Sequence, residues 1–124
     1  MITIDYKSRL PLYEQLVENI RMLVLSGALE GDEQLPSVRQ LSSDLGINPN
    51  TVQKAYAYLE QAGVIYTAPG RGAFVRSDTS SLRSGRSGEI LEQLGSLAAE
   101  LMKLGIPEED AVQRIREAYK EGKK

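Results

Sequence analysis

Apolar residues near the start of the chain recur every three or four positions, which predicts an amphipathic helix. This apolar stripe consists of Leu12, Leu16, Val17, Ile20, Leu23 and Val24. Pro11 stands where the first turn of a helix tolerates proline, and Gly27 is a natural end point. Ahead of this helix, Ile2 and Ile4 alternate with polar residues, so we expect a short strand or an extended arm there.

Two further helices are predicted, separated by a tight turn. The second begins with Ser37 as N-cap and Gln40 three residues later, the pattern of a capping box, and Gly46 ends it. The third begins with Asn48 as N-cap and Pro49 in the first helical position, and we expect it to stop at Gly63. The expected buried faces are Val38, Leu41 and Leu45 in the second helix, and Val52, Ala55, Tyr56 and Leu59 in the third. Two short helices joined by a glycine-containing turn form a helix-turn-helix.

A β-hairpin is predicted immediately after the third helix. Residues 64–67 and 74–76 are β-prone, and they bracket the turn-forming sequence Ala-Pro-Gly-Arg-Gly at residues 68–72. A hairpin in this position would be the wing of a winged helix-turn-helix.

The composition then changes, which divides the chain into residues 1–76, a linker at 77–88 and a tail at 89–124. The linker is rich in Ser, Gly and Arg, which is typical of a flexible connector, although the same segment could extend the tail helix. The tail carries a short heptad-like seam made of Ile90, Leu94, Leu97, Leu101 and Leu104. A last helix, opened by Pro107, includes Ile115 and Tyr119 on its apolar face. The predicted fold is therefore mainly α-helical with a small β-hairpin, ending in a two-helix tail.

Composition argues against catalysis and metal binding. The 124-residue chain contains no His and no Cys, so the usual general base, the commonest nucleophiles and most zinc ligand sets are missing. We predict neither an enzyme nor a bound cofactor or metal. No stretch approaches the roughly 20 apolar residues that cross a bilayer, so a soluble, cytoplasmic protein without a membrane partner is expected.

Positive charge is concentrated where the helix-turn-helix and the wing lie. The whole chain has 17 acidic and 15 basic residues, which counts against binding nucleic acid by bulk charge. Between residues 36 and 76, however, the only acids are Asp44 and Glu60. The bases in that range are Arg39, Lys54, Arg71 and Arg76.

The third helix has a polar face suited to a DNA groove. Asn50, Gln53, Lys54 and Ala57 lie opposite its apolar stripe. Asn and Gln can pair with an adenine edge, Lys can donate to guanine or phosphate, and Ala can touch a thymine methyl group. An ordinary solvated helix face is the alternative. Arg39, in the first turn of the second helix, is poorly placed for the helix dipole unless a phosphate, a base or a neighbouring carboxylate lies nearby.

These residues resemble the GntR family of bacterial transcription factors, over residues 9 to 76. The resemblance is carried by residues 27–41 (GALEGDEQLPSVRQL), 48–56 (NPNTVQKAY), 59–63 (LEQAG) and 70–75 (GRGAFV). The opening PLYEQL at residues 11–16, the NPNTV turn and the short tail are similar to the YtrA-type subfamily in particular. The resemblance implies a winged helix-turn-helix that binds a palindromic operator in double-stranded DNA as a homodimer, usually as a repressor. The positions it implies as DNA contacts are Ser37, Arg39, Asn48, Asn50, Thr51, Gln53, Lys54, Gly70, Arg71 and Gly72.

The tail is expected to make the homodimer. About forty residues are too few to enclose a ligand pocket of ordinary size, and two helices with one apolar face each need a partner to cover those faces. The predicted dimerisation residues are the five seam residues together with Ile115 and Tyr119. Binding of a small-molecule effector between the tail and residues 1–76, called the head from here on, remains an alternative, although no polar cluster points to such a site. The alternative function is a winged-helix module that binds another protein, which the acidic first helix would suit.

Overall fold

The computed structural model describes residues 1–123, in which five helices and one β-hairpin are found. In chain order the elements are α1 (Leu12–Leu25), α2 (Val38–Leu45), α3 (Pro49–Gln61), β1 (Ile65–Ala68), β2 (Gly72–Val75), α4 (Ser80–Lys103) and α5 (Glu108–Gly122). Residues 1–83 form one compact unit, and a second begins at Ser84. The predicted fold class, mainly helical with a small hairpin, is confirmed.

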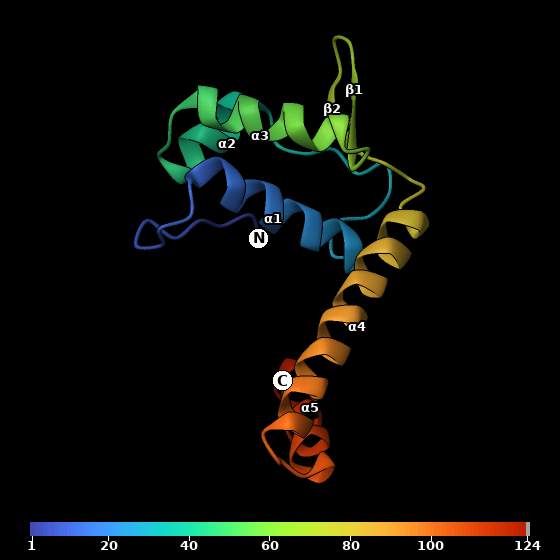
Figure 1. Ribbon diagram of the computed structural model, residues 1–124. Coiled ribbons are helices and arrows are strands. Elements are labelled where there is room, and N and C mark those ends of the chain that lie inside the picture. Colours follow the sequence, from blue (N-terminus) through green and yellow to red (C-terminus); the bar gives the residue numbers. More distant parts are fainter. Residues whose placement is uncertain (124) are drawn as a thin grey trace. The chain divides into compact units, whose positions relative to one another are not determined.

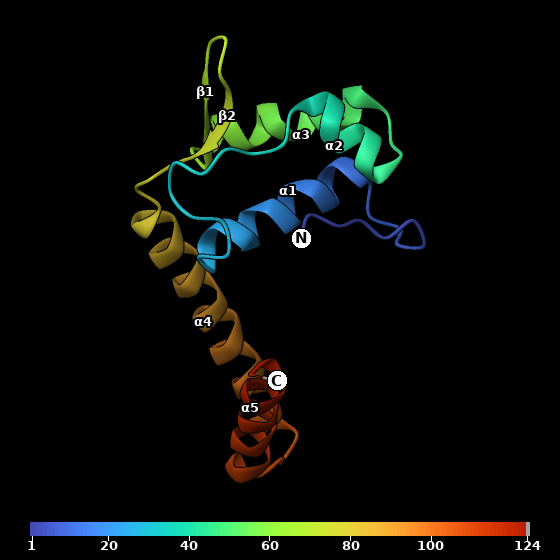
Figure 2. The ribbon, with the colours of Figure 1, turned by 180° about the vertical axis from the view of Figure 1, so that it is seen from behind.

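The core of the first unit is the contact between α1 and α3, which lie side by side in Figures 1 and 2. Leu16 and Ile20 of α1 and Val52, Ala55 and Leu59 of α3 are all fully buried. Burial of this kind is the main favourable term in folding, at about 1.5 to 3 kcal/mol for each large aliphatic side chain. The apolar stripe of α3 is therefore fixed against α1, and the opposite side of α3 is turned to solvent.

The helix-turn-helix is formed as predicted, with one correction at the start of α2. The Ser37 hydroxyl accepts a hydrogen bond from the Gln40 backbone N–H at 3.0 Å, which is the expected N-cap. The Gln40 side chain, however, donates to Asp44 Oδ1 at 2.7 Å, because that carboxylate lies one turn further along the same helix. Only half of the capping box therefore exists. At the turn, Gly46 adopts a left-handed φ of 68° and Asn48 caps α3 through the Asn50 N–H at 2.8 Å.

The hairpin pairs β1 with β2 in antiparallel register, from Ile65 opposite Val75 to Ala68 opposite Gly72. The strands begin at Ile65 and Gly72, so β2 starts two residues earlier than predicted and the turn is shorter. A third extended segment, which the sequence pattern did not indicate, lies along the far side of β2. There Leu35 N–H donates to the Ala73 carbonyl and Val75 N–H donates to the Glu33 carbonyl, both at 2.9 Å.

The N-terminal residues form an extended arm, the second of the two predicted alternatives. Ile2 and Ile4 are half-buried against the core. The arm backbone is hydrogen-bonded to side chains of α1: Thr3 N–H donates to Asn19 Oδ1 at 3.0 Å and Asp5 N–H to Gln15 Oε1 at 2.7 Å. Side chains of α1 thus accept the backbone hydrogen bonds that a neighbouring strand would otherwise accept, and the arm is not paired in a β-ladder.

The sequence predicts residues 77–88 to be either a flexible connector or an extension of the tail helix. They are helical from Ser80 onward, where they form the first turns of α4. Gly85 and Gly88 lie inside this helix, although glycine costs about 1 kcal/mol relative to alanine in a helix interior. Leu82 packs against the core of the first unit, which supports the beginning of the helix. At the other end, Gly105 has a left-handed φ of 77° and turns the chain into α5.

Tyr56 provides a test of this packing. Its hydroxyl donates to the Pro36 carbonyl at 2.7 Å, and burial raises the pKa of Tyr56 to about 12 from the ordinary 10.0. We expect Tyr56→Phe to lower the free energy of unfolding at neutral pH by about 1 to 2 kcal/mol, because the Pro36 carbonyl loses its donor.

The same tyrosine predicts an alkaline effect. Since its folded pKa is raised, its contribution is complete below pH 10.0 and is lost as the pH rises towards about 12. Urea denaturation of both proteins should show the difference in stability shrinking across that range. A difference independent of pH would contradict the assignment.

Candidate nucleic-acid interface

The polar face of α3 is exposed along its whole length. Asn50, Gln53, Lys54 and Ala57 are all exposed, on the side of α3 opposite its buried stripe, and Thr51 is half-buried. Figure 1 shows α1 below α3 and the β-hairpin projecting on the other side. The hairpin therefore projects from the side of the first unit opposite α1, and the predicted α3 residues Asn50, Gln53 and Lys54 lie on the solvent-exposed face of α3.

The N-terminus of α2 carries an exposed cation, Arg39. Ser37 and Arg39 are both exposed, and the Ser37 hydroxyl already accepts the capping hydrogen bond. The ion pairs within residues 1–123 are Glu18–Arg21, Arg86–Glu89 and Arg114–Glu117, so Arg39 takes part in none of them. A neighbouring carboxylate, one of the three partners considered for Arg39, is therefore not found in the part of the chain that the structure describes.

Asn48, the N-cap of α3, uses only its side-chain oxygen for capping. Asn48 Oδ1 accepts the Asn50 N–H at 2.8 Å, and Asn48 is exposed. Its amide nitrogen remains as a donor at the N-terminus of the helix, where backbone N–H groups also favour an anion. Asn48 can therefore act as cap and as ligand-binding residue at once.

Lys54 makes a contact that the sequence did not reveal. Its ammonium nitrogen lies 3.9 Å from the centre of the Tyr13 ring, a cation–π arrangement between α3 and α1. The Tyr13 hydroxyl donates to Glu14 at 3.2 Å, and this hydrogen bond with the carboxylate's charge raises the pKa of Tyr13. The phenol thus stays neutral, and its ring supports an exposed lysine beside the polar face of α3.

The hairpin carries Arg71 at its tip. Tyr66 and Phe74 stack across the two strands with ring centres 5.5 Å apart, which stiffens the hairpin. Gly70 and Gly72 have left-handed φ values of 75° and 122°, so the tip makes a turn that L-residues rarely adopt. Arg71 between them is exposed. The structure therefore presents a single cation on a short, glycine-flanked turn.

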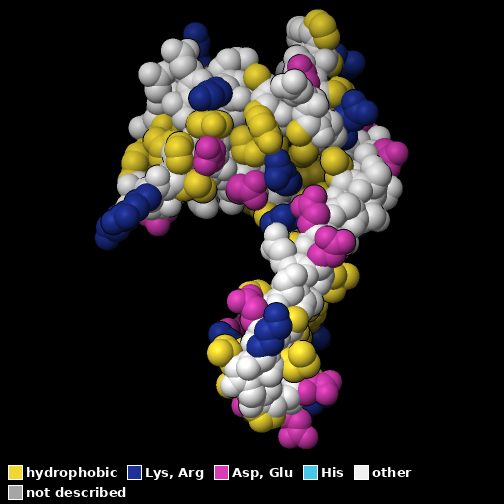
Figure 3. All heavy atoms as spheres, viewed as in Figure 1, with side chains coloured by type: hydrophobic (Ala, Val, Ile, Leu, Met, Phe, Trp, Pro, Cys, Tyr) yellow, Lys and Arg dark blue, Asp and Glu magenta, His cyan; other side chains and the backbone are white. Residues whose placement is uncertain are grey.

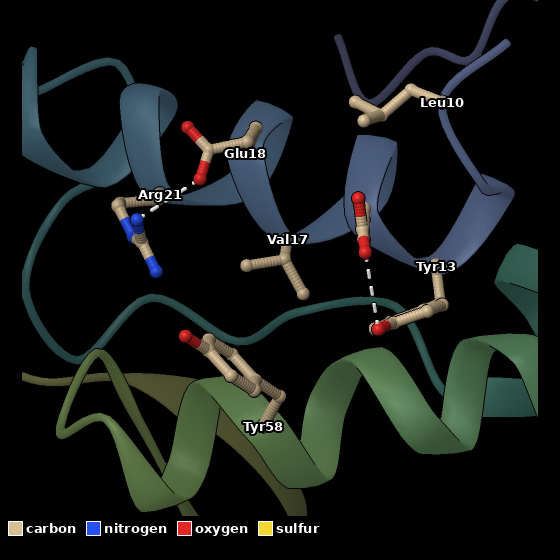
Figure 4. Close-up of a pocket in the computed structure, with 7 residues that line it drawn as sticks. Leu10, Tyr13, Val17, Glu18, Arg21 and Tyr58 are labelled. Carbon is tan, nitrogen blue, oxygen red and sulfur yellow. Dashed lines mark hydrogen bonds and ion pairs between the residues drawn. The ribbon is translucent and has the colours of Figure 1, made fainter.

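A shallow hollow of about 370 Å³ lies between α1 and α3, on the Tyr13 side (Figure 4). It is lined by Leu10, Tyr13, Glu14, Val17, Glu18, Arg21 and Tyr58. Figure 3 shows hydrophobic side chains gathered in a band between these two helices. Arg21 pairs with Glu18 at 2.9 Å and Tyr13 with Glu14, so the charged groups at the rim have partners and we assign no ligand here.

The tail exposes most of the predicted seam. Neither α4 nor α5 contains a fully buried residue. Leu101 is half-buried, and the other predicted tail residues are exposed, by 37% for Ile115 up to 76% for Leu104. These are Ile90, Leu94, Leu97, Leu104, Ile115 and Tyr119. A single chain thus leaves apolar side chains of both tail helices in contact with water.

Two residues that shape this interface were missed at the sequence level. The Tyr6 hydroxyl donates to the carbonyls of Leu45 and Gly46 at 2.7 and 3.2 Å, which joins the N-terminal arm to the turn before α3. The Gln34 side chain donates to the Arg71 carbonyl at the hairpin tip. Both contacts join positions about forty residues apart, for which periodicity gives no signal.

Two kinds of feature are not found among the described residues. No helix within residues 1–123 is long and apolar enough to span a membrane. The same residues contain no group of three or more acidic side chains arranged to hold a metal ion.

Comparison with known families gives one match over the head of the chain. A family model described as "Bacterial regulatory proteins, gntR family" matches residues 12–75, which run from the first residue of α1 to the end of β2. The HTH-type transcriptional repressor YtrA of Bacillus subtilis (strain 168) is 38% identical over 118 residues, covering 94% of this chain and 91% of that protein. This likeness therefore includes the tail.

Two solved structures are similar to the chain at different scales. A transcriptional regulator from Oenococcus oeni aligns with a TM-score of 0.75 and 36% identity, over 94% of this chain and 96% of that one. The structure of AraR(DBD) in complex with operator ORE1 aligns with a TM-score of 0.52 and 28% identity, over 60% of this chain and 92% of that one. The first likeness covers head and tail, and the second is close to the length of the head alone.

Proposed function

This chain belongs to the GntR family, whose members are DNA-binding transcriptional regulators, and on that premise we propose that it is a repressor that binds a palindromic operator as a homodimer. The resemblance drawn from the sequence motifs is confirmed at the level of the family and of its YtrA-type members. The operator, the homodimer and the sign of regulation are the proposal. Operator binding would take place in the cytoplasm, on chromosomal DNA.

The observation that carries the proposal is the two-sided character of α3. Its apolar side is fully buried against α1, so Asn50, Gln53 and Lys54 stand exposed as a row on a rigidly held helix. A helix of this kind fits the major groove of B-DNA, where amide side chains read adenine and lysine reads guanine or phosphate. The operator complex of AraR(DBD), whose fold is similar, supports the same use of this head.

The remaining predicted residues would fix the head on the DNA backbone. Arg39 and Arg71 are exposed cations on α2 and on the hairpin, on either side of α3 in the sequence. Ser37, Asn48 and Thr51 lie at or near helix N-termini, which favour phosphate. Gly70 and Gly72 let the backbone of the hairpin tip approach a groove closely. Base reading would thus fall to α3, and positioning to its neighbours.

The homodimer is supported by the apolar surface of the tail. Exposure of leucines and isoleucines to water on two consecutive helices is unfavourable unless a partner covers them. A second copy of the chain offers the same apolar surface as a partner. A two-fold dimer would present two α3 helices to half-sites about 34 Å apart or a multiple of that distance. The proposal needs no effector, so the purified protein alone should bind.

Selection of random duplex DNA by the purified protein, followed by sequencing, tests this function directly. We expect an enriched inverted repeat. Its affinity should fall steeply with salt, because displaced counterions are released when phosphates are contacted. Failure to enrich any sequence at low salt would overturn the proposal as stated and would favour either a regulator that requires an effector or a protein-binding winged helix. Binding that is insensitive to salt would overturn it in favour of the protein-binding winged helix.

Substitutions on the head should weaken DNA binding without unfolding the protein. Arg39→Ala and Lys54→Ala should each reduce affinity for the selected operator about five- to hundredfold, since a good contact is worth about 1 to 3 kcal/mol. Fluorescence anisotropy measures the affinity, and circular dichroism verifies the fold. Lys103→Ala, which removes a lysine at the end of α4, is the matched control and should bind normally. Unchanged affinity in either head variant would refute that residue's role.

Substitutions in the tail should break the dimer. Leu94→Asp or Leu101→Asp places a charge in the apolar seam, so sedimentation velocity should show monomers where the wild type shows dimers. Ser96→Asp is the control, because Ser96 is exposed and lies on the polar side of α4 between Glu92 and Glu100. Dimers that survive both leucine substitutions would show that another surface holds the two copies together.

A further inference from the structure

Gln34 joins the loop before α2 to the tip of the hairpin. Its backbone lies beside Phe74 of β2 in an antiparallel bridge. Its side chain extends to the tip, where Nε2 donates to the Arg71 carbonyl at 2.9 Å. Gln34 is exposed, so this hydrogen bond contributes little to the core and acts mainly on the hairpin.

Gly72 makes room for this hydrogen bond. A Cβ atom at position 72 would lie 2.9 Å from Gln34 Nε2, closer than real Cβ contacts occur. The φ of 122° at Gly72 is also one that L-residues rarely adopt. The glycine and the glutamine therefore form one arrangement: the missing side chain at 72 leaves space for the amide that holds residue 71.

Holding the Arg71 carbonyl fixes the orientation of the peptide between residues 71 and 72. The Arg71 N–H donates to the Ala68 carbonyl at 2.9 Å, so both peptide groups of Arg71 are hydrogen-bonded. With its backbone fixed on both sides, the direction in which the Arg71 side chain leaves the tip is fixed as well.

We propose that Gln34 is a positioning residue that orients Arg71 for its contact with DNA. The inference rests on the proposed DNA-binding function and assigns Gln34 a part in it. The same loop runs on through Leu35 and Pro36 into α2, and Pro36 accepts the hydrogen bond from Tyr56 of α3. Gln34 thereby links the position of the hairpin tip to the start of the helix-turn-helix.

The test compares Gln34→Met, Arg71→Ala and the double variant on the selected operator. Met has nearly the same shape as Gln but no donor. We expect Gln34→Met to lower affinity about three- to tenfold, the worth of one lost neutral hydrogen bond. It should have little further effect once Arg71 is replaced by Ala. Gln61→Met, an exposed glutamine at the end of α3, is the control and should bind as the wild type does.

Salt dependence separates positioning from direct contact. Gln34 is uncharged, so replacing it removes no phosphate-binding cation of its own. We nevertheless expect the slope of log affinity against log salt to fall towards that of Arg71→Ala, a loss of about 1. Additive losses in the double variant, or an unchanged slope, would show that Gln34 contacts DNA itself or acts elsewhere, and would overturn the proposal.

A measurement without DNA keeps this test independent of the proposed function. In the free protein, Gln34→Met should speed amide hydrogen exchange at Arg71 and Gly72 several-fold, while the amides of α3 are unchanged. Unchanged exchange at the tip would overturn the positioning role. If the wild type binds no duplex while exchange at the tip does respond, the operator function fails and the DNA-contact part of this inference fails with it.

Discussion

The burial of α3 against α1 is the contact on which the rest of the head depends. Five side chains with no exposed surface meet there, and they leave α3 only one face to present to solvent. Because a close-packed core permits little rotation of a helix, the polar row of α3 is held in a defined direction. The turn before α3, the arm that contacts that turn and the loop that precedes α2 all take their positions from this packing.

The head combines a rigidly packed α3 with side chains from distant parts of the chain that hold the neighbouring loops in place. Tyr6 donates to the turn before α3, Tyr56 donates to the loop before α2, and Gln34 donates to the hairpin tip. All three use a side chain to satisfy a backbone carbonyl. Such contacts add little net free energy each, but they restrict loops that would otherwise move independently. The sites of expected DNA contact are thus tied to one core.

The sequence predicted what local rules govern. Apolar spacing predicted the buried stripe of α3, and Ser37, Asn48 and Gly46 marked the helix ends correctly because capping and left-handed turns depend on neighbouring residues. It did not predict the Lys54–Tyr13 contact, the role of Gln34 or the third segment beside β2, which all depend on tertiary packing. The Ser- and Gly-rich segment was ambiguous, since its composition suits a connector while Leu82 packs on the core and supports a helix.

The glycines in the first turns of α4 have a consequence for the DNA sites that the proposed dimer would occupy. Gly85 and Gly88 lower the stability of this stretch of helix, because each costs about 1 kcal/mol relative to alanine and no side chain there is fully buried. Bending or unwinding one turn is then inexpensive compared with a contact to DNA. In the homodimer proposed above, such helices would tolerate variation in the number of base pairs between half-sites, so a single regulator could serve operators of unequal spacing.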